Sequence, residues 1–271
     1  MSTRLFGLLG DPVASSLSPA LHGYWLEVYG IDARYVAQRC RGDVAAVLRA
    51  EKFAGANLTT PLKRAILGDL ATITPAAQAI GAVNTVVVGA DGALHGDNTD
   101  AAGLAASLGN LAGREAIVLG AGGAGRAAAY ALLTAGSPRV TVLNRTVAAA
   151  EALARDLGGP IVPGPLTPGA FDAAATARLV VNATTGAARD AVLALDPRRL
   201  PADAAWCDLN YWDPDPPGFA ACRASGRQTV DGGDMLVRQA ALAFARFTGV
   251  TPAPDEIARA WARAVSPERG V

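Results

Sequence analysis

The fold is decided by a strand, a glycine-rich turn and a helix that follow one another in AIVLGAGGAGRAAAYALL, residues 116–133. The apolar run 116–119 is typical of a strand covered on both faces. GAGGAG at 120–125 then fits G-x-G-x-x-G. The first glycine allows a tight turn, the second lets backbone approach a pyrophosphate, and the third lets helix and strand pack closely. The segment predicts a dinucleotide-binding unit of the Rossmann type, with the anion at the helix N-terminus.

The position after the next predicted strand, residues 140–143, decides the kind of nucleotide. A site for NAD usually carries an acid there, roughly 20 residues beyond the glycines, which accepts from the ribose hydroxyls. This sequence instead has Asn144-Arg145-Thr146 and no acid. A guanidinium beside the ribose attracts a 2′-phosphate through paired hydrogen bonds. We therefore expect NADP rather than NAD; the alternative is that Arg145 is an ordinary surface arginine.

Length and composition exclude several classes of protein. At about 150 residues per domain, 271 residues predict two domains. With 51% hydrophobic and 18% charged residues, the chain has enough apolar material for buried cores. Basic and acidic residues balance at 24 each, which disfavours general nucleic-acid binding. The apolar runs are too short for a membrane span, and the N-terminus is broken too early for a signal peptide.

Cysteine and histidine are too sparse to suggest a metal site. The three cysteines, Cys40, Cys207 and Cys222, are widely spaced, and only two histidines are present. A zinc site would have to gather scattered ligands, so we expect no metal. Few cysteines in an odd number suit a reducing cytoplasm.

Strands and helices are expected to alternate in both halves of the chain. In the first half we expect strands at 5–9, 34–39, 56–59 and 82–88, with helices at 18–29, 43–54 and from 62. In the second half we expect further strands at 179–181 and 205–207, then helices at 235–247 and 254–264. Ser18 is expected to be the N-cap of the first helix. This alternation predicts α/β layers with mostly parallel sheets.

Four polar clusters stand at predicted strand–helix junctions in the first half. They contain Ser16 with Ser18, Lys63 at the end of NLTTPLK, Asn84 within GAVNT, and Asp100 at the end of GDNTD. Taken singly, the serines fit an ordinary helix cap and the lysine fits a solvated helix face. Taken together with a neighbouring hydride acceptor, they can hold a polyhydroxylated acid and move a proton at a secondary alcohol.

These motifs resemble, in order along the chain, those of the shikimate dehydrogenase family, whose members interconvert 3-dehydroshikimate and shikimate with NADP(H). The matching segments are SLSP at 16–19, NLTTPLK at 57–63, GAVNT at 81–85, GDNTD at 96–100, GAGGA at 120–124, NRT at 144–146 and NAT at 182–184. The resemblance runs nearly end to end, and several motifs in order are far more specific than one.

The resemblance implies a role for each matching position. Lys63 is the expected catalytic lysine and Asp100 its partner. The expected substrate contacts are Ser16, Ser18, Thr59, Asn84, Tyr211 and Gln239. The expected cofactor contacts are Gly120, Ala121, Gly122, Gly123, Ala124, Asn144, Arg145, Thr146, Gly232 and Met235. No metal is implied.

The resemblance also implies an architecture and a cellular role. A substrate-binding catalytic domain would cover 1–100 and be completed by helices in 234–271, while a Rossmann-type NADP-binding domain would cover 101–233. The protein would be a cytoplasmic enzyme of aromatic amino acid biosynthesis. It would act on a small molecule as a monomer or homodimer, without nucleic acid or membrane.

Some positions depart from the family pattern. Ser15 stands where the family often has histidine, and Ala149 stands where many members have a second basic residue. Gly233-Asp234 and the segment YWDPDPP at 211–217 are also unusual. A quinate or broad-specificity dehydrogenase is therefore an alternative, and a non-catalytic ligand sensor of the same fold is another. A folate-type methylene dehydrogenase is disfavoured because Ser16 and Ser18 suit a small carboxylate.

Overall fold

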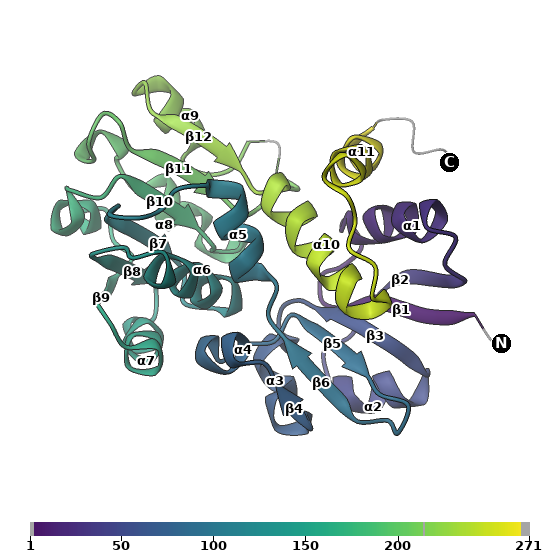
Figure 1. Ribbon diagram of the computed structural model, residues 1–271. Coiled ribbons are helices and arrows are strands. Elements are labelled where there is room, and N and C mark those ends of the chain that lie inside the picture. The colour runs from purple at the N-terminus through teal and green to yellow at the C-terminus, as the bar shows by residue number, and fades with distance from the viewer. Residues whose placement is uncertain (1–2, 214, 267–271) are drawn as a thin grey trace. The chain divides into compact units, whose positions relative to one another are not determined.

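The computed structural model describes residues 3–213 and 215–266 (Figure 1). Within these ranges the chain forms two compact units: the chain up to Thr99 together with the chain from Leu236 on, and Asp100–Met235. The first unit is thus built from both ends of the sequence. Asp100 falls in the second unit because it opens helix α5, which packs on α6 of that unit.

The first unit contains a mixed sheet in the order β2-β1-β3-β5-β6-β4. Its strands are β1 (Arg4–Gly10), β2 (Ala33–Arg39), β3 (Phe53–Leu58), β4 (Thr72–Ile73), β5 (Thr85–Val88) and β6 (Leu94–Asp97). The pairs β1–β2, β1–β3 and β4–β6 are parallel, and β5 runs antiparallel to both of its neighbours. The expected strand over 82–88 begins only at Thr85, because the Val83 amide donates instead to the Lys63 carbonyl.

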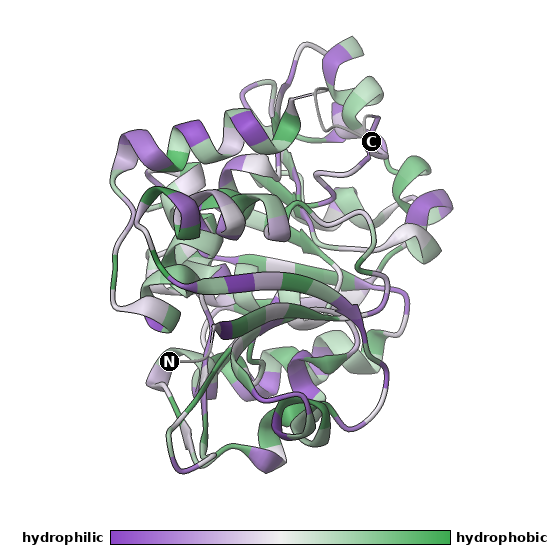
Figure 2. Cartoon of the chain, turned by 90° about the vertical axis from the view of Figure 1, so that its right-hand side faces the viewer, coloured by the Kyte–Doolittle hydropathy of each residue, from purple (hydrophilic) through white to green (hydrophobic). Residues whose placement is uncertain are grey.

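Helices from both ends of the chain cover this sheet. They are α1 (Ser18–Val28), α2 (Val44–Ala50), α3 (Leu62–Ala65), α4 (Pro75–Ile80), α10 (Gly233–Thr248) and α11 (Pro254–Val265). The purple α1 and the yellow α11 lie side by side in Figure 1, and Trp25 Nε1 donates to the Glu256 carbonyl between them at 3.2 Å. Green and purple alternate along the helices in Figure 2, as expected for amphipathic helices.

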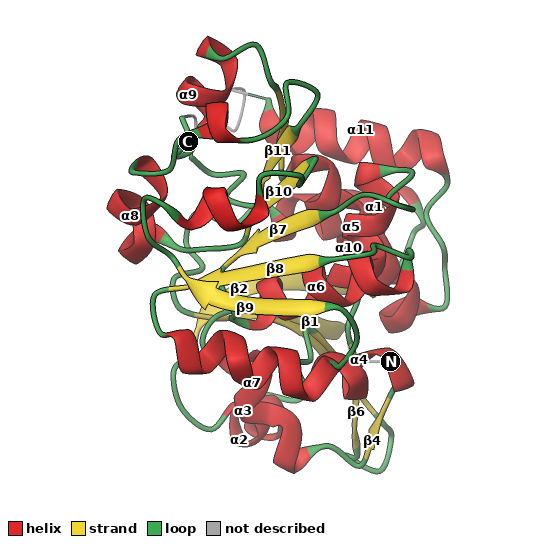
Figure 3. Cartoon of the chain, turned by 90° about the vertical axis from the view of Figure 1, so that its left-hand side faces the viewer, coloured by secondary structure: helices red, strands yellow, loops and turns green. Residues whose placement is uncertain are grey.

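The second unit contains a wholly parallel sheet in the order β12-β11-β10-β7-β8-β9 (Figure 3). Its strands are β7 (Ala116–Leu119), β8 (Val140–Asn144), β9 (Ile161–Pro165), β10 (Leu179–Asn182), β11 (Ala205–Asp208) and β12 (Gln228–Asp231). Counted from β7, this is the order 3-2-1-4-5-6 of a Rossmann sheet. The strand order reverses between β7 and β10, where such sheets bind ligands beyond the carboxyl ends of the strands.

The helices of the second unit connect these strands. They are α5 (Asp100–Leu108), α6 (Gly123–Thr134), α7 (Val147–Leu157), α8 (Arg189–Leu193) and α9 (Phe219–Ala224). The central strands carry the core, and Ile117, Val180 and Trp206 are at most 1% exposed. The fold class expected from the sequence, two α/β domains with mostly parallel sheets, is confirmed.

Candidate active site

Lys63 is held by the turn that follows β3. The Leu62 amide donates to the Thr59 carbonyl at 2.8 Å, which starts the short helix α3 directly after the strand. Leu62 and Ile66, four residues apart on one face, are buried under this turn. The Lys63 carbonyl accepts from the Val83 amide at 2.7 Å, and the Lys63 side chain is half-buried. The lysine is therefore fixed through its backbone to the segment that leads into Asn84.

Asn84 is the centre of a buried hydrogen-bond network in the first unit. Its Nδ2 donates to Thr99 Oγ1 at 2.9 Å and to Gln239 Oε1 at 3.2 Å. Its Oδ1 accepts from the Thr99 amide at 2.8 Å and from Thr85 Oγ1 at 2.9 Å. Asn84 and Gln239, both expected from the sequence, are thus brought together although 155 residues separate them. Thr85 and Thr99 belong to the quoted motifs, but sequence reasoning gave them no role.

Asn57 and Tyr35 extend this hydrogen-bond network to strands β3 and β2. Asn57 Nδ2 donates to the Asn84 carbonyl at 3.2 Å and to Thr85 Oγ1 at 3.1 Å. Its Oδ1 accepts from the Tyr35 hydroxyl at 2.8 Å. Tyr35 was missed by sequence reasoning because it lies in a different strand, β2, and no local motif marks it. Every buried polar group in this chain of contacts is an amide or a hydroxyl, which avoids the cost of a buried charge.

Ser16 and Ser18 lie together, but not as an ordinary cap. Ser18 is the first residue of α1, and the N-cap position falls on Leu17 without a side-chain hydrogen bond. The expectation that Ser18 is the N-cap is therefore wrong. Ser16 Oγ instead accepts from the Ser18 amide and donates to Ser18 Oγ, both at 3.2 Å. The Ser16 hydroxyl thus closes a turn just before the helix, and this turn brings the two side chains into contact.

The glycine-rich turn of the second unit has the geometry that a dinucleotide requires. Gly120 has φ +100°, a conformation that favours glycine. A Cβ on Gly125 would lie 2.0 Å from the Gly120 carbonyl oxygen, so the third glycine permits close packing of helix on strand. A Cβ on Gly122 would meet no protein atom within 4 Å. Gly122 therefore faces open space at the start of α6, where a phosphate can approach free backbone amides.

The segment after β8 lies beside this turn. Asn144 Oδ1 accepts from the Ala121 amide at 3.2 Å, and Asn144 Nδ2 donates to the Thr146 carbonyl at 2.9 Å. Arg145 is exposed, and its Nη1 donates to the Ala187 carbonyl at 3.0 Å. Its guanidinium can therefore meet an anion from solvent without first leaving a buried ion pair. These residues fit an adenosine 2′-phosphate.

The remaining expected contacts in the second unit stand after its last two strands. Tyr211 is half-buried and packs edge-on against exposed Trp212, with ring centroids 4.9 Å apart. A Cβ on Gly232 would lie 2.8 Å from the Asp208 carbonyl oxygen, so only glycine fits there without a shift. Met235 is 8% exposed in the first turns of α10.

Two of the cysteines and one histidine are buried in a way that disfavours their charged forms. Burial raises the pKa of Cys207 to about 12 and that of Cys222 to about 11, so neither thiol is a ready nucleophile. Burial lowers the pKa of His22 to about 3, so this imidazole stays neutral. Among the described residues, no three side chains of histidine, cysteine, aspartate or glutamate gather as metal ligands would.

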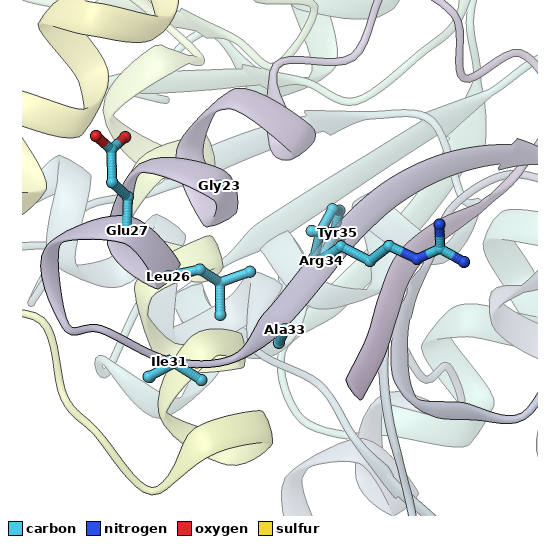
Figure 4. A pocket seen from close by; sticks show the side chains of 7 residues that line it. All are labelled: Gly23, Leu26, Glu27, Ile31, Ala33, Arg34 and Tyr35. Atoms are coloured by element: carbon cyan, nitrogen blue, oxygen red, sulfur yellow. The ribbon is translucent and has the colours of Figure 1, made fainter. Parts of the chain in front are cut away.

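The first unit also has a surface hollow that is not lined by the expected site residues. It is lined by Gly23, Leu26, Glu27, Ile31, Ala33, Arg34 and Tyr35 on α1, β2 and their connection (Figure 4). None of the site residues expected from the sequence lines it.

In the described part of the chain, no helix is both long and apolar enough to cross a bilayer.

Comparisons with known proteins agree with these motifs. Three family models match: the shikimate dehydrogenase substrate binding domain over residues 8–86, shikimate / quinate 5-dehydrogenase over 103–189, and the shikimate 5′-dehydrogenase C-terminal domain over 232–260. A shikimate dehydrogenase (NADP(+)) of Methylobacterium radiotolerans is 42% identical, covering 90% of this chain and 91% of that protein. The chain belongs to the shikimate dehydrogenase family. The resemblance drawn from the sequence is thereby confirmed.

Solved structures of family members have the same fold. Shikimate 5-dehydrogenase of Thermus thermophilus, in complex with NADP(H) and shikimate, is 40% identical with a TM-score of 0.83, covering 97% of this chain and all of that one. Quinate dehydrogenase of Corynebacterium glutamicum, in complex with NAD, is 32% identical with the same TM-score of 0.83, covering 97% and 99%. The family therefore includes a shikimate dehydrogenase solved with NADP(H) and a quinate dehydrogenase solved with NAD.

Proposed function

We propose that the protein catalyses the reversible, NADP-dependent reduction of 3-dehydroshikimate to shikimate, with Lys63 as the proton-transfer residue. The protein is an oxidoreductase of the shikimate dehydrogenase family, and two relatives that are 41–42% identical are named shikimate dehydrogenase (NADP(+)). One observation carries the assignment of Lys63: its backbone is bonded to the segment that bears Asn84, the centre of the buried amide network. This backbone hydrogen bond fixes the short helix α3, which carries Lys63, to that segment.

In this proposal each group has a separate task. Lys63 donates a proton to the carbonyl oxygen as the ketone is reduced, and accepts it back in the reverse direction. Asp100, buried at the start of α5, is the partner that orients the lysine. Bound NADPH supplies the hydride to the carbonyl carbon. Proton and hydride together account for the two hydrogens gained.

The remaining predicted residues bind and orient. Ser16 and Ser18 present adjoining hydroxyls that suit the ring carboxylate, and Tyr211 is assigned to the same group. Asn84 and Gln239 hold ring hydroxyls, while Thr59 lines the approach to Lys63. In the second unit, the turn at Gly120–Ala124 with Asn144, Arg145 and Thr146 holds the phosphates, and Gly232 and Met235 lie on the nicotinamide side.

The test is absorbance of reduced nicotinamide during oxidation of shikimate by NADP. Lys63→Ala is expected to lower kcat on the order of 10²–10⁴-fold, the usual contribution of a general acid–base group, with little change in KM. The control is Lys52→Asn, which removes the other lysine; Lys52 is exposed at φ +58°, a conformation that asparagine tolerates. Wild-type kcat in Lys63→Ala would remove Lys63 from the chemistry.

A second candidate is a dehydrogenase for quinate or for several ring acids. The observation in its favour is Ala149 in the first turn of α7, which leaves Arg145 as the cation of the NRT segment. Steady-state rates on shikimate and quinate, each with NADP and NAD, separate the two functions. Binding of shikimate without turnover would instead favour a ligand sensor.

We place the enzyme in the cytoplasm, in aromatic amino acid biosynthesis, acting on a small molecule as a monomer or homodimer. Buried, unpaired thiols at Cys40, Cys207 and Cys222 support a reducing compartment. Sedimentation of the purified protein measures the oligomeric state.

A further inference from the structure

Asp208, at the end of β11, is a buried carboxylate that the proposed mechanism does not use. Its exposure is 0%. Its Oδ2 accepts from Asn182 Nδ2 at 2.6 Å, and its Oδ1 accepts from the Asn210 amide at 3.0 Å and from Asn210 Nδ2 at 2.7 Å. Burial raises the pKa of Asp208, while the bonds from Asn182 and Asn210, and the neighbouring Trp206 side chain, oppose that rise. Both oxygens of this side chain accept hydrogen bonds from N–H donors, three in all, as expected for a carboxylate.

Through Asn182 this carboxylate reaches the turn that follows β10. Asn182 Oδ1 accepts from the Thr184 amide at 3.1 Å and from Thr184 Oγ1 at 2.7 Å. The turn 182–184 lies against the glycine-rich turn 120–125, which is the phosphate loop of this unit. A Cβ on Gly120 would be 3.1 Å from the Ala183 carbonyl oxygen. The turn 182–184 therefore lies at the carboxyl end of β10, where the strand order reverses.

We propose that Asp208 is a positioning residue for the dinucleotide: it holds the turn 182–184 against the phosphate loop and fixes the turn that leads to Tyr211. The proposal rests on the assignment of the second unit as the NADP-binding unit. Asp208 acts through Asn182 on one side and through Asn210 on the other. The ends of β10 and β11 are thus tied into one arrangement before any ligand arrives, which lowers the ordering cost of binding.

The direction of these hydrogen bonds makes the proposal testable. In Asp208→Asn one carboxylate oxygen becomes an NH₂ group, which faces a donor on Asn182 or on Asn210. If the Asn182 amide turns over to accept, its own NH₂ then faces the Thr184 amide. The conflict can move along the relay but cannot disappear, because every position already has its donors.

An exchange of the two side chains removes the conflict. In the double variant N182D/D208N, the amide at 208 donates to the carboxylate at 182 and accepts from both Asn210 donors. The carboxylate at 182 still accepts from the Thr184 amide and hydroxyl. The composition, the net charge and the number of hydrogen bonds are those of the wild type, and only the direction of the central bond is reversed.

The experiment measures the Kd of NADP by calorimetric titration, with circular dichroism to show that each variant is folded. D208N is expected to bind NADP at least roughly tenfold more weakly, the effect of an unsatisfied buried donor passed to the turn. The double variant is expected to recover wild-type Kd to within about threefold, because every donor again has an acceptor. The control is Asp203→Asn, an exposed carboxylate of the same unit paired with Arg178, which should bind as wild type.

Wild-type Kd in folded D208N, or a double variant as weak as D208N, overturns the proposal. If D208N does not fold, the double variant decides alone: near-wild-type Kd supports the relay and weak binding refutes it. A purely structural role would lower the Tm of D208N without moving the Kd of its folded form. Because the readout is NADP binding, wild-type protein that binds NADP but does not oxidise shikimate refutes only the proposed function.

Discussion

Acid is expected to destabilise the first unit through His22. This side chain on α1 is 1% exposed and stacks on Tyr35, with ring centroids 4.1 Å apart and planes within 5°. Among the described residues, its Nε2 has no hydrogen-bond partner. Burial lowers the pKa of His22 from its usual 6.5 to about 3. The folded protein therefore holds the neutral imidazole throughout the mildly acidic range.

The size of the effect follows from proton linkage. Below pH 6.5 the unfolded chain binds a proton at His22 that the folded chain refuses until about pH 3. Stability then falls with each unit of pH by about 1.4 kcal/mol. Acidification from pH 6.5 to pH 5 removes about 2 kcal/mol from the free energy of unfolding. Above pH 6.5 both states are neutral at this residue, and it contributes no pH dependence.

The assay is denaturant unfolding at pH 7 and pH 5, comparing wild type with His22→Phe. Phenylalanine keeps an aromatic ring against Tyr35 but cannot bind a proton. Other titrating groups contribute equally to both proteins, so the difference between them isolates His22. The loss of stability from pH 7 to pH 5 should be about 2 kcal/mol smaller in the variant. Hydrogen exchange of peptides from α1 assigns the change to the first unit.

Equal losses in the two proteins would refute this reasoning. They would mean that the folded state takes up the proton as readily as the unfolded chain does, and hence that the imidazole reaches solvent. A smaller loss in wild type than in the variant would contradict the sign of the effect.

Four further substitutions test the site. Gly125→Ala should lower Tm because its Cβ would meet the Gly120 carbonyl oxygen at 2.0 Å, whereas Gly122→Ala should keep Tm and weaken NADP binding, since its Cβ meets only open space. Asn84→Ala should cost about 3 kcal/mol in unfolding free energy by leaving buried donors without an acceptor; an unchanged denaturation midpoint would contradict this. Arg145→Ala should raise the Kd of NADP about tenfold and leave that of NAD unchanged; equal effects on both would exclude contact with the 2′-phosphate.

The fold was predictable where local chemistry is distinctive. β7 is an apolar run followed by glycines, and α6 begins at Gly123 within that glycine-rich segment. The edge strands β9 and β12 were not predicted, because they are largely exposed and lack a continuous apolar run. β9 reads Ile-Val-Pro-Gly-Pro, a composition that resembles a loop and that only an edge position tolerates. The hydrophobic pattern of a sequence reveals strands whose side chains are buried. Edge strands bury few side chains, so they lack this pattern.

The site was predictable residue by residue but not as a network. GAVNT marks Asn84, yet nothing in the sequence says that its amide meets Gln239 on a helix near the other end of the chain. The stack of His22 on Tyr35 joins α1 to β2 in the same way, through packing that no spacing rule encodes. Motifs identify groups by their chemistry, whereas partners distant in sequence depend on the completed fold.

The two units solve the same problem with different electrostatics. Each places polar side chains where strands end. A parallel strand buried on both faces is apolar, so the functional groups come after its last residue. In the first unit the supporting groups of the buried network, Asn57 and Asn84 among them, are uncharged. In the second unit the support is a buried carboxylate, Asp208, and the expected ligand is anionic. A negative charge there is tolerable only because three N–H donors compensate it, so its value lies in directing those donors rather than in attracting the ligand.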